Sequence, residues 1–177
     1  PKVLSLEESI SLLEAVENDK DSNFRIRDYA MLTLFLNCGM RVSELVGIDL
    51  QDVNREIRSL RVTGKGAKER IIYLNDACKS ALLAYLPVRA AMADRILPED
   101  KTALFLSTRR NQRISQKTVQ YIVYKYLDMA GLGHKKLSTH KLRHTAATLM
   151  YQSGNVDVRV LKEILGHEQL NTTQIYT

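Results

Sequence analysis

The sequence predicts a mainly α-helical protein of the α+β class, with a small antiparallel β-sheet of two or three strands. Apolar residues recur at helical spacing along most of the chain, whereas residues 58–74 contain two β-prone runs around a glycine-rich turn. The 177 residues suffice for one domain with a sizeable hydrophobic core. We therefore expect residues 1–177 to form one domain.

The N-terminal part is expected to be helical. Ser5 and Glu8 have the spacing of a capping box and precede apolar residues at helical spacing. A second helix is expected from Arg25 to Cys38, ending at Gly39, and a short helix follows within the sequence MRVSELVGI. These signals place the first three helices before residue 49.

The β-hairpin has the strongest local signal in the chain. The runs SLRV and RIIYL flank TGKGAK, whose glycines favour a tight turn with Lys65 at its tip. This turn is not a Walker A loop, because GxxxxGK followed by Ser or Thr is absent. A later run, ALFLS, is either a third strand or the lead-in to the basic loop TRRNQR.

Helices are expected again in the second half. A long helix begins near Asn75, and Pro87 is expected to break or kink it. Ser115 is expected to cap a further helix that runs to Ala130 and ends at Gly131. Two more helices are expected, over residues 139–154 and 156–165.

Composition and charge narrow the possible partners and location. The formal net charge is +6 and the isoelectric point is near 9.4, which favours a polyanion such as nucleic acid as partner. No apolar run is long enough to span a bilayer, and no signal peptide is evident. Cys38 and Cys78 are far apart in sequence and lack a CxxC pattern, so a disulfide framework or a cysteine-based zinc site is not expected. A reducing, cytoplasmic location is the expectation.

The stretch THKLRHTAATLMYQSG carries an unusual amount of positive or ionisable charge in its first helical turn. His140 and Arg143 are three residues apart and lie on one helix face, with His144 one turn from His140. The positive end of the helix dipole disfavours cations there unless an anion lies opposite. One interpretation is a phosphate clamp, and a second is a zinc site, although the glutamate of HExxH is missing. The third is a solvated basic turn in which His144 forms a hydrogen bond inside the core.

Two other segments carry candidate residues. Arg41 begins the short helix after Gly39, and Glu44, one turn on, is placed to orient it by a charge-assisted hydrogen bond. The alternative is an ordinary surface ion pair, and Lys65 taken alone is equally consistent with a solvated hairpin lysine. Near the C-terminus, His167 follows Gly166 at an expected helix end, and Tyr176 lies nine residues further on.

Taken together, these segments resemble the tyrosine recombinases, the phage-integrase and Xer-like family. Arg41 in GMRVSEL, the lysine hairpin GKGAKER, HKLRHTAATLM, LGH and TTQIYT occur in that family's order and approximate spacing. The resemblance covers essentially the whole chain as the catalytic domain. Two departures are expected: no counterpart of the usual N-terminal DNA-clamping domain, and none of the C-terminal segment that commonly packs on a neighbouring subunit.

The resemblance implies a site-specific recombinase that cleaves and rejoins DNA through a 3′-phosphotyrosyl intermediate. It implies that Tyr176 is the nucleophile and that Arg41 and Arg143 hold the non-bridging phosphate oxygens. It implies that His140 bonds the phosphate or shuttles the proton of Tyr176, and that His167 donates to a non-bridging oxygen. It also implies that Lys65 protonates the leaving 5′-oxygen. Glu44 and His144 are expected to support these groups. The chain has no pair of carboxylates suited to Mg²⁺, so no metal or other cofactor is expected.

The implied partners are a double-stranded recombination site and further recombinase subunits in a synaptic tetramer on DNA, with the isolated domain monomeric. Phosphate contacts would give a steep salt dependence of binding. The basic residues expected to make them are Lys68, Arg70, Arg109, Arg110, Arg113, Lys135, Lys136 and Lys141. Three alternatives remain open at this point: a type IB topoisomerase-like enzyme, a helical DNA-binding module without catalytic activity, and a metalloprotein built on His140 and His144.

Overall fold

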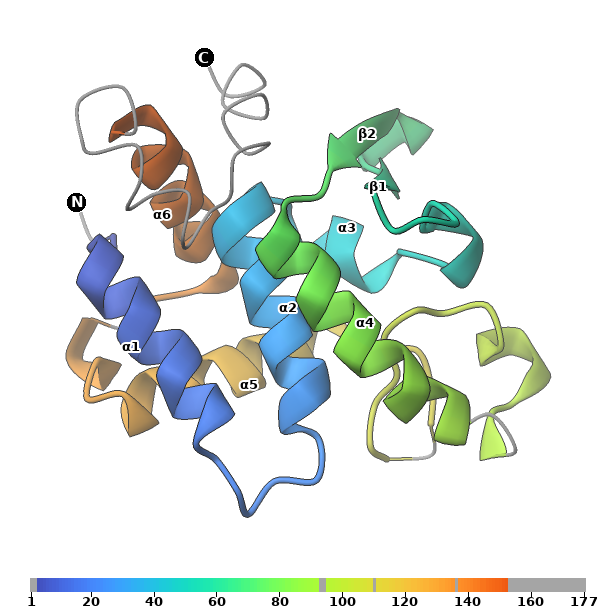
Figure 1. Cartoon of the computed structure of the whole chain (residues 1–177), viewed down its shortest axis with the longest axis horizontal. Helices are drawn as coiled ribbons and strands as arrows, with labels where there is room; N and C mark the ends of the chain where they lie inside the picture. Colours follow the sequence, from blue (N-terminus) through green and yellow to red (C-terminus); the bar gives the residue numbers. More distant parts are fainter. Residues whose placement is uncertain (1–2, 93–94, 110, 136, 153–177) are drawn as a thin grey trace.

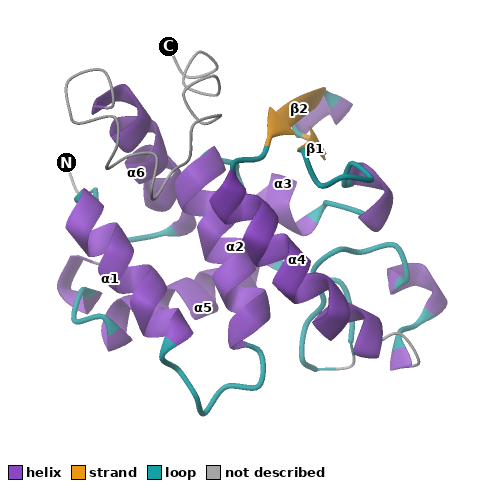
Figure 2. Cartoon of the chain, in the orientation of Figure 1, coloured by secondary structure: helices purple, strands orange, loops and turns teal. Residues whose placement is uncertain are grey.

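The structure is a computed structural model that describes residues 3–92, 95–109, 111–135 and 137–152 (Figure 1). Within these ranges, helices predominate and a single two-stranded antiparallel sheet is present (Figure 2). The helices are α1 (Leu6–Glu17), α2 (Arg25–Cys38), α3 (Val42–Val46), α4 (Asp76–Ala91), α5 (Gln116–Met129) and α6 (Thr139–Gln152). The strands β1 (Ser59–Thr63) and β2 (Glu69–Tyr73) lie between α3 and α4. The predicted α+β class, mainly helical, is therefore confirmed.

Helix α2 is the centre of the core. Its second half is mostly apolar, and each residue from 30 to 38 is buried. A helical segment that is buried on every side must be covered by neighbouring elements all round. Helices α1, α4 and α6 pack against α2 and provide that cover (Figure 1). The end of α2 is fixed by Gly39, whose φ of +61° is left-handed, as predicted.

Predicted helix ends are confirmed at two other places. The Ser5 Oγ accepts from the Glu8 N–H at 3.1 Å, while Glu8 Oε1 accepts from the Ser5 N–H at 2.9 Å. This reciprocal pair is the predicted capping box of α1. Helix α5 begins after Ser115, whose Oγ accepts from the Thr118 N–H at 3.1 Å, and Gly131 follows its end with φ +76°.

Of the two effects expected at Pro87, the break is wrong, and the kink stays a prediction. Helix α4 continues through Pro87 to Ala91. A proline inside a helix removes the hydrogen bond to the carbonyl four residues earlier, here that of Leu83. Leu83 and Pro87 are both exposed, so water can solvate this carbonyl on the outer face of the helix.

The run ALFLS is not a third strand. Ala103 and Leu106 each form only an isolated bridge, with Asp49 and Arg113 respectively. Leu104 is buried, and its N–H donates to the Ile48 carbonyl at 2.9 Å. The segment is therefore a buried connection whose main-chain bonds go to neighbouring loops, in agreement with the lead-in alternative.

Helix α6 is attached to the beginning of the chain as well as to α2. Its apolar residues Leu142, Ala146 and Leu149 are buried, as its helical pattern predicts. The Leu4 N–H donates to the Thr145 Oγ1 at 3.0 Å, across a separation of 141 residues. The helix predicted over residues 156–165 lies outside the described residues. None of the described helices has the length and apolar character that crossing a membrane requires.

Candidate active site

Arg41 lies at the N-cap of α3, immediately after the left-handed end of α2. Its main-chain N–H donates to Glu44 Oε1 at 2.9 Å, which closes the first turn of α3. The Arg41 side chain is exposed, and no acceptor among the described residues takes a hydrogen bond from its guanidinium. Its donors are therefore available to an external anion.

Arg143 connects α6 to the end of α2. Its Nε donates to the Gly39 carbonyl oxygen at 2.8 Å, across a sequence separation of 104 residues. Gly39 lies two residues before Arg41. This bond therefore brings the MRVSEL and HKLRH segments together, and it orients a half-buried guanidinium beside the start of α3.

His140 and His144 lie one helical turn apart on α6, and both rings are exposed. Their centroids are 5.1 Å apart, and the rings meet edge to face at 85°. With Arg143 and Ala147 they line a hollow of about 260 Å³. The alternative in which His144 forms a hydrogen bond inside the core is wrong, because the ring faces outward. No cluster of three potential metal ligands occurs among the described residues.

Glu44 is a buried carboxylate, and its side chain is only 2% exposed. Oε1 accepts from Arg70 Nη2 at 3.0 Å, and Oε2 accepts from Arg70 Nε at 3.2 Å. Burial alone would raise the pKa of the Glu44 carboxyl, but the bonds from Arg70 and from the Arg41 amide outweigh burial and lower the pKa. The expected bond from Glu44 to the Arg41 guanidinium is replaced by one to its main chain, while the carboxylate charge pairs with Arg70.

Lys65 is exposed in the turn between β1 and β2, as the hairpin pattern predicts. The Gly64 N–H donates to the Lys68 carbonyl at 2.7 Å and closes this turn. Lys65 shares a hollow of about 970 Å³ with Arg41 and Glu44. The hairpin and the start of α3 therefore face one open space.

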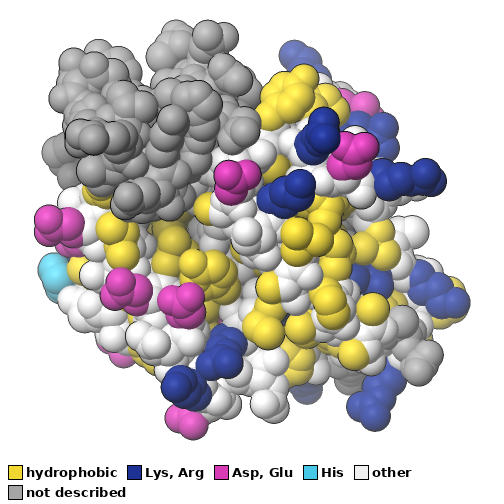
Figure 3. Space-filling view, viewed as in Figure 1, with side chains coloured by type: hydrophobic (Ala, Val, Ile, Leu, Met, Phe, Trp, Pro, Cys, Tyr) yellow, Lys and Arg dark blue, Asp and Glu magenta, His cyan; other side chains and the backbone are white. Residues whose placement is uncertain are grey.

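Among the predicted phosphate contacts, three described residues are accessible. Lys68 and Arg109 are exposed, and Lys141 is half-buried. Lys and Arg side chains also gather around the β1–β2 hairpin on the face drawn in Figure 3. This surface is suited to a polyanion.

Three other predicted contacts bond within the protein. Arg70 pairs with Glu44, and Lys135 Nζ lies 2.8 Å from Glu8 Oε1. Arg113 forms an ion pair with Asp49 and donates from Nη1 to the main-chain carbonyl of Val46 at 2.9 Å. These partners give the three cations a structural role that their sequence positions do not reveal. The remaining predicted site residues lie outside the described part of the chain: Arg110, Lys136, His167 and Tyr176.

Sequence reasoning missed a buried polar cluster beneath the site, between α2 and α4. The Asn75 Nδ2 donates to Asn37 Oδ1 at 2.8 Å, and both side chains are fully buried. The buried cysteines Cys38 and Cys78, distant in sequence, place their Sγ atoms 3.8 Å apart. The available signal was Asn37, an amide in the mostly apolar second half of α2, because a buried amide needs a hydrogen-bond partner.

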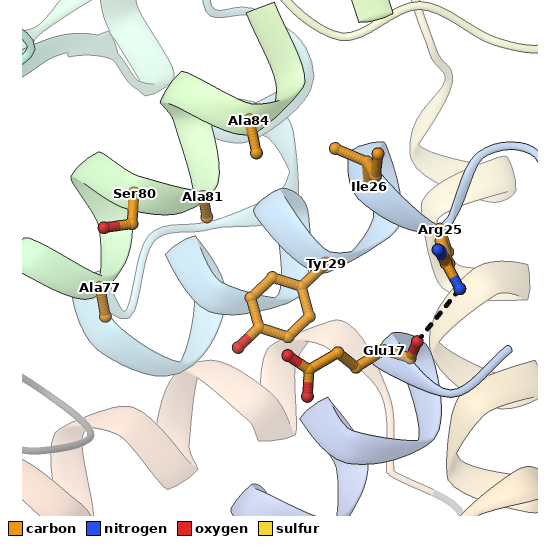
Figure 4. A pocket seen from close by; sticks show the side chains of 8 residues that line it. All are labelled: Glu17, Arg25, Ile26, Tyr29, Ala77, Ser80, Ala81 and Ala84. Atoms are coloured by element: carbon orange, nitrogen blue, oxygen red, sulfur yellow. Dashed lines mark hydrogen bonds between the residues drawn. The ribbon is translucent and has the colours of Figure 1, made fainter. Parts of the chain in front are cut away.

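A third hollow, of about 460 Å³, lies between α1, α2 and α4 (Figure 4). Its walls include Tyr29, Ile26 and small residues of α4. The charged side chains in its lining are Glu17 and Arg25, and the Arg25 Nη1 donates to the Glu17 main-chain carbonyl at 3.4 Å. This hollow offers no excess positive charge for a phosphate, in contrast to the one that contains Arg41 and Lys65.

Comparison with known proteins gives relatives over the full chain. It is 56% identical over 177 residues to the tyrosine recombinase XerC of Caldanaerobacter subterraneus subsp. tengcongensis, of which it covers 47%. It is 42% identical over 179 residues to XerC of Thermodesulfovibrio yellowstonii, of which it covers 58%. The chain thus spans about half the length of the curated relatives it matches.

Solved structures agree with this relationship. The crystal structure of XerA recombinase superposes with a TM-score of 0.74 at 34% identity, over 100% of this chain and 60% of that one. The XerH recombinase bound to its difH substrate gives 0.73 at 29% identity, over 99% of this chain and 50% of that one. Residues 2–177 match the phage integrase family, and the chain therefore belongs to that family.

Proposed function

We propose that this chain is the catalytic domain of a site-specific tyrosine recombinase that serves DNA integration, excision or dimer resolution. The observation that carries the proposal is the bond from Arg143 to the Gly39 carbonyl, which joins the two arginine motifs. Two guanidinium groups at one place are suited to a phosphodiester, because each can donate two parallel hydrogen bonds to its oxygens. The XerC relatives support the same assignment.

The proposed reaction is a transfer of the phosphoryl group from DNA to tyrosine and back. The Tyr176 phenol, with an ordinary pKa of about 10, loses its proton to His140 and forms a bond to phosphorus. The bond from phosphorus to the 5′-oxygen breaks, and Lys65 gives this oxygen its proton. The reverse attack by a 5′-hydroxyl releases Tyr176 and rejoins the strand. The covalent bond retains the energy of the phosphodiester, so no nucleotide or metal is required.

Arg41 and Arg143 act on the phosphate itself in this proposal. Their charge offsets the negative charge that develops on the non-bridging oxygens, and each donor of this kind contributes about 100- to 1000-fold in rate. His140, exposed beside Arg143, takes the proton of Tyr176 and contacts the phosphate. His167 donates to a non-bridging oxygen. His144 meets His140 edge to face, which is consistent with a supporting role.

The proposed partner is a double-stranded recombination site, bound by four recombinase subunits in a synapse. The exposed Lys68 and Arg109 support phosphate contacts, and XerH is a related recombinase solved on its substrate. The chain by itself is expected to be monomeric and to bind DNA weakly. Analytical ultracentrifugation that found a stable tetramer without DNA would contradict this part.

The decisive experiment replaces the proposed nucleophile. Tyr176→Phe is expected to abolish covalent protein–DNA adducts on a nicked suicide substrate, while DNA binding persists in a gel-shift assay. Tyr121→Phe is the matched control, since Tyr121 is 76% exposed on α5 and should keep wild-type adduct formation. Adducts at wild-type level in Tyr176→Phe would overturn the assignment. The absence of adducts from the wild type as well would favour a DNA-binding module.

Two further measurements separate the remaining alternatives. Cleavage is expected to continue in EDTA, whereas loss on chelation and recovery with Zn²⁺ would favour a metal site at His140 and His144. Strand exchange between two sites is expected in a synapsis assay. Relaxation of supercoiled plasmid without any pairing of sites would favour a type IB topoisomerase-like enzyme.

A further inference from the structure

Arg70 occupies an unusual place in the hairpin, on its inner face. In the antiparallel register, Arg70 is opposite Val62 and Ile72 is opposite Leu60. Directly opposed residues share one face of a sheet, and alternate residues of a strand return to that face. The other three members of this face, Leu60, Val62 and Ile72, are buried and apolar. The Arg70 side chain is only 23% exposed, so its charge needs a partner close by.

That partner belongs to the element that carries Arg41. The Arg70 Nε and Nη2 donate separately to the two oxygens of Glu44, at 3.2 and 3.0 Å. The same carboxylate accepts the Arg41 main-chain N–H at 2.9 Å. A continuous chain of bonds therefore leads from β2 through one buried carboxylate to the N-cap of α3.

This chain of bonds also determines where the lysine turn lies. Strand β2 begins directly after the turn, and the bond from the Gly64 N–H to the Lys68 carbonyl joins the two ends of the turn. Lys65, Glu44 and Arg41 line the same hollow. A rotation of the hairpin about its connections would change the distance between the Lys65 ammonium and anything held by Arg41.

We propose that Arg70 is a positioning residue for Lys65, and that its pair with Glu44 fixes the lysine turn relative to the Arg41 site. The inference rests on the proposed function, in which Lys65 protonates the leaving oxygen. Arg70 then contributes to catalysis through geometry and does not contact DNA phosphate. This replaces the role that its basic character alone suggests.

The hairpin offers a matched control in Arg61. Arg61 is on β1, one residue from Val62, and donates from Nε to Asp52 Oδ1 at 3.0 Å. It too attaches the hairpin to a neighbouring segment by an ion pair, but its side chain is 43% exposed and Asp52 has no bond to Arg41. If weaker attachment of the hairpin in general slows cleavage, both Arg70→Gln and Arg61→Gln should be slow. If Arg70 positions Lys65, only Arg70→Gln should be slow.

The experiment measures single-turnover cleavage by Arg70→Gln, Lys65→Ala, Arg61→Gln and the double variant Arg70→Gln/Lys65→Ala. Each is tested on normal DNA and on DNA with a 5′-bridging sulfur. A thiolate leaves readily, since a thiol has a pKa near 8.5 for comparison with cysteine, and it hardly needs an acid. Misplacement of a reacting group by about 1 Å costs roughly 100-fold. We expect Arg70→Gln to be slower by about this factor on normal DNA and to recover with sulfur.

In the double variant, the Arg70 substitution should add nothing to the effect of Lys65→Ala, because a residue that acts through Lys65 has no effect once Lys65 is absent. Arg61→Gln should stay close to wild type on both substrates. The inference would be overturned if cleavage by the double variant were slowed by the product of the two single-variant factors. A loss of DNA affinity in Arg70→Gln accompanied by a salt slope smaller by about one, which marks a phosphate contact, would also overturn it.

Failure of the proposed function gives a different result. If sulfur does not rescue Lys65→Ala, Lys65 is not the acid, yet the comparison of single and double variants still tests whether Arg70 acts through it. Arg70→Lys covers the case in which Arg70→Gln does not fold, as judged by circular dichroism. Lysine keeps the charge but lacks the two separate donors, so we expect an intermediate rate and the same recovery with sulfur. A wild-type rate in Arg70→Lys would contradict positioning by the paired bonds.

Discussion

Two groups of arginines in this protein differ in how their charge is matched. Arg27, on α2, is buried and donates from Nε and Nη2 to Asp28 Oδ1 at 2.9 and 2.8 Å. Its Nη1 donates to the Leu106 carbonyl at 2.9 Å, and the Tyr126 hydroxyl lies 3.1 Å from Asp28 Oδ2. Burial raises the pKa of the Asp28 carboxyl, although Arg27 and Tyr126 oppose this shift. At this position the protein itself provides both the cation, Arg27, and its counterion, Asp28.

The arginine site at the other end of α2 is different. Arg41 is exposed, and Arg143 donates from Nε to the Gly39 carbonyl, a neutral acceptor. The buried carboxylate nearby, Glu44, pairs with Arg70 and so leaves the Arg41 guanidinium to solvent. The contrast is that the charge of Arg27 has a buried counterion beside it, whereas Arg41 is held through its main chain and its guanidinium is exposed.

The largest expected effect is at the buried pair. Arg27→Ala leaves Asp28 buried without its partner, which costs about 3–5 kcal/mol of unfolding free energy. Urea denaturation followed by circular dichroism measures it. As the matched control, Arg27→Met/Asp28→Leu removes both charges and should be far less destabilised. A loss below about 1 kcal/mol in Arg27→Ala would show that the pair is not a folding contact.

The next effect is on catalysis. Arg41→Ala is expected to slow cleavage by about 100- to 1000-fold, because a donor to the phosphate oxygens is lost. Its unfolding free energy should change by no more than about 0.5 kcal/mol, as for ordinary surface positions. Arg55→Ala, at an exposed position between α3 and β1, is the control. If Arg41→Ala destabilised the protein as Arg27→Ala does, the contrast between the two groups would be lost.

A pH titration tests the ion pair between Glu44 and Arg70. The Glu44 pKa is lowered from its usual 4.5, so the folded state binds this proton less tightly than the unfolded state. Glu44 therefore stabilises the fold above pH 4.5, and this contribution disappears as pH falls through the lowered pKa. Glu44→Gln should be less stable than wild type by about 1.5–3 kcal/mol at neutral pH, the range for charged hydrogen bonds. A difference that did not narrow in acid would contradict the ion pair.

The smallest effect separates two cations that look alike in sequence. Lys68→Ala should lower the salt slope of DNA binding by about one, as expected for a lost phosphate contact. Arg113→Ala should leave this slope nearly unchanged but reduce stability, because Arg113 bonds to Asp49 and to the Val46 carbonyl. Fluorescence anisotropy at several salt concentrations measures the slopes. Equal slopes for both variants would place Arg113 on the DNA.

Local signals in the sequence predicted much of the fold. The Ser5–Glu8 capping box, the Gly39 helix end and the hairpin around Lys65 each depend on residues close in sequence. The break expected as one alternative at Pro87 was wrong, because helix continuity there depends on solvation of the exposed turn around Leu83, which is a property of the packed structure. The role of ALFLS was undecided for a similar reason, since its hydrogen bonds go to distant loops.

The sequence predicted which residues contribute to the site, but it predicted only part of what each residue does there. The helical spacing of His140 and Arg143 places them on one face, but their meeting with Arg41 came only from the family resemblance. Arg70 and Arg113 looked like Lys68, because their partner carboxylates lie 26 and 64 residues away in sequence. Pairing across such separations depends on tertiary packing, which periodicity and local motifs do not contain.

The bond between Arg143 and Gly39 has a consequence for the order in which the site arises during synthesis. A chain that has emerged from the ribosome only as far as residue 137 contains Arg41 and Lys65 but lacks α6. Both of the long-range attachments of α6, to Gly39 and to Leu4, form only after α6 has been made. A nascent chain of that length therefore has one arginine of the pair, and the second can join it only once α6 has been made. Assembly from distant segments thus delays the meeting of the two arginines, and with it the proposed reaction, until α6 has been added.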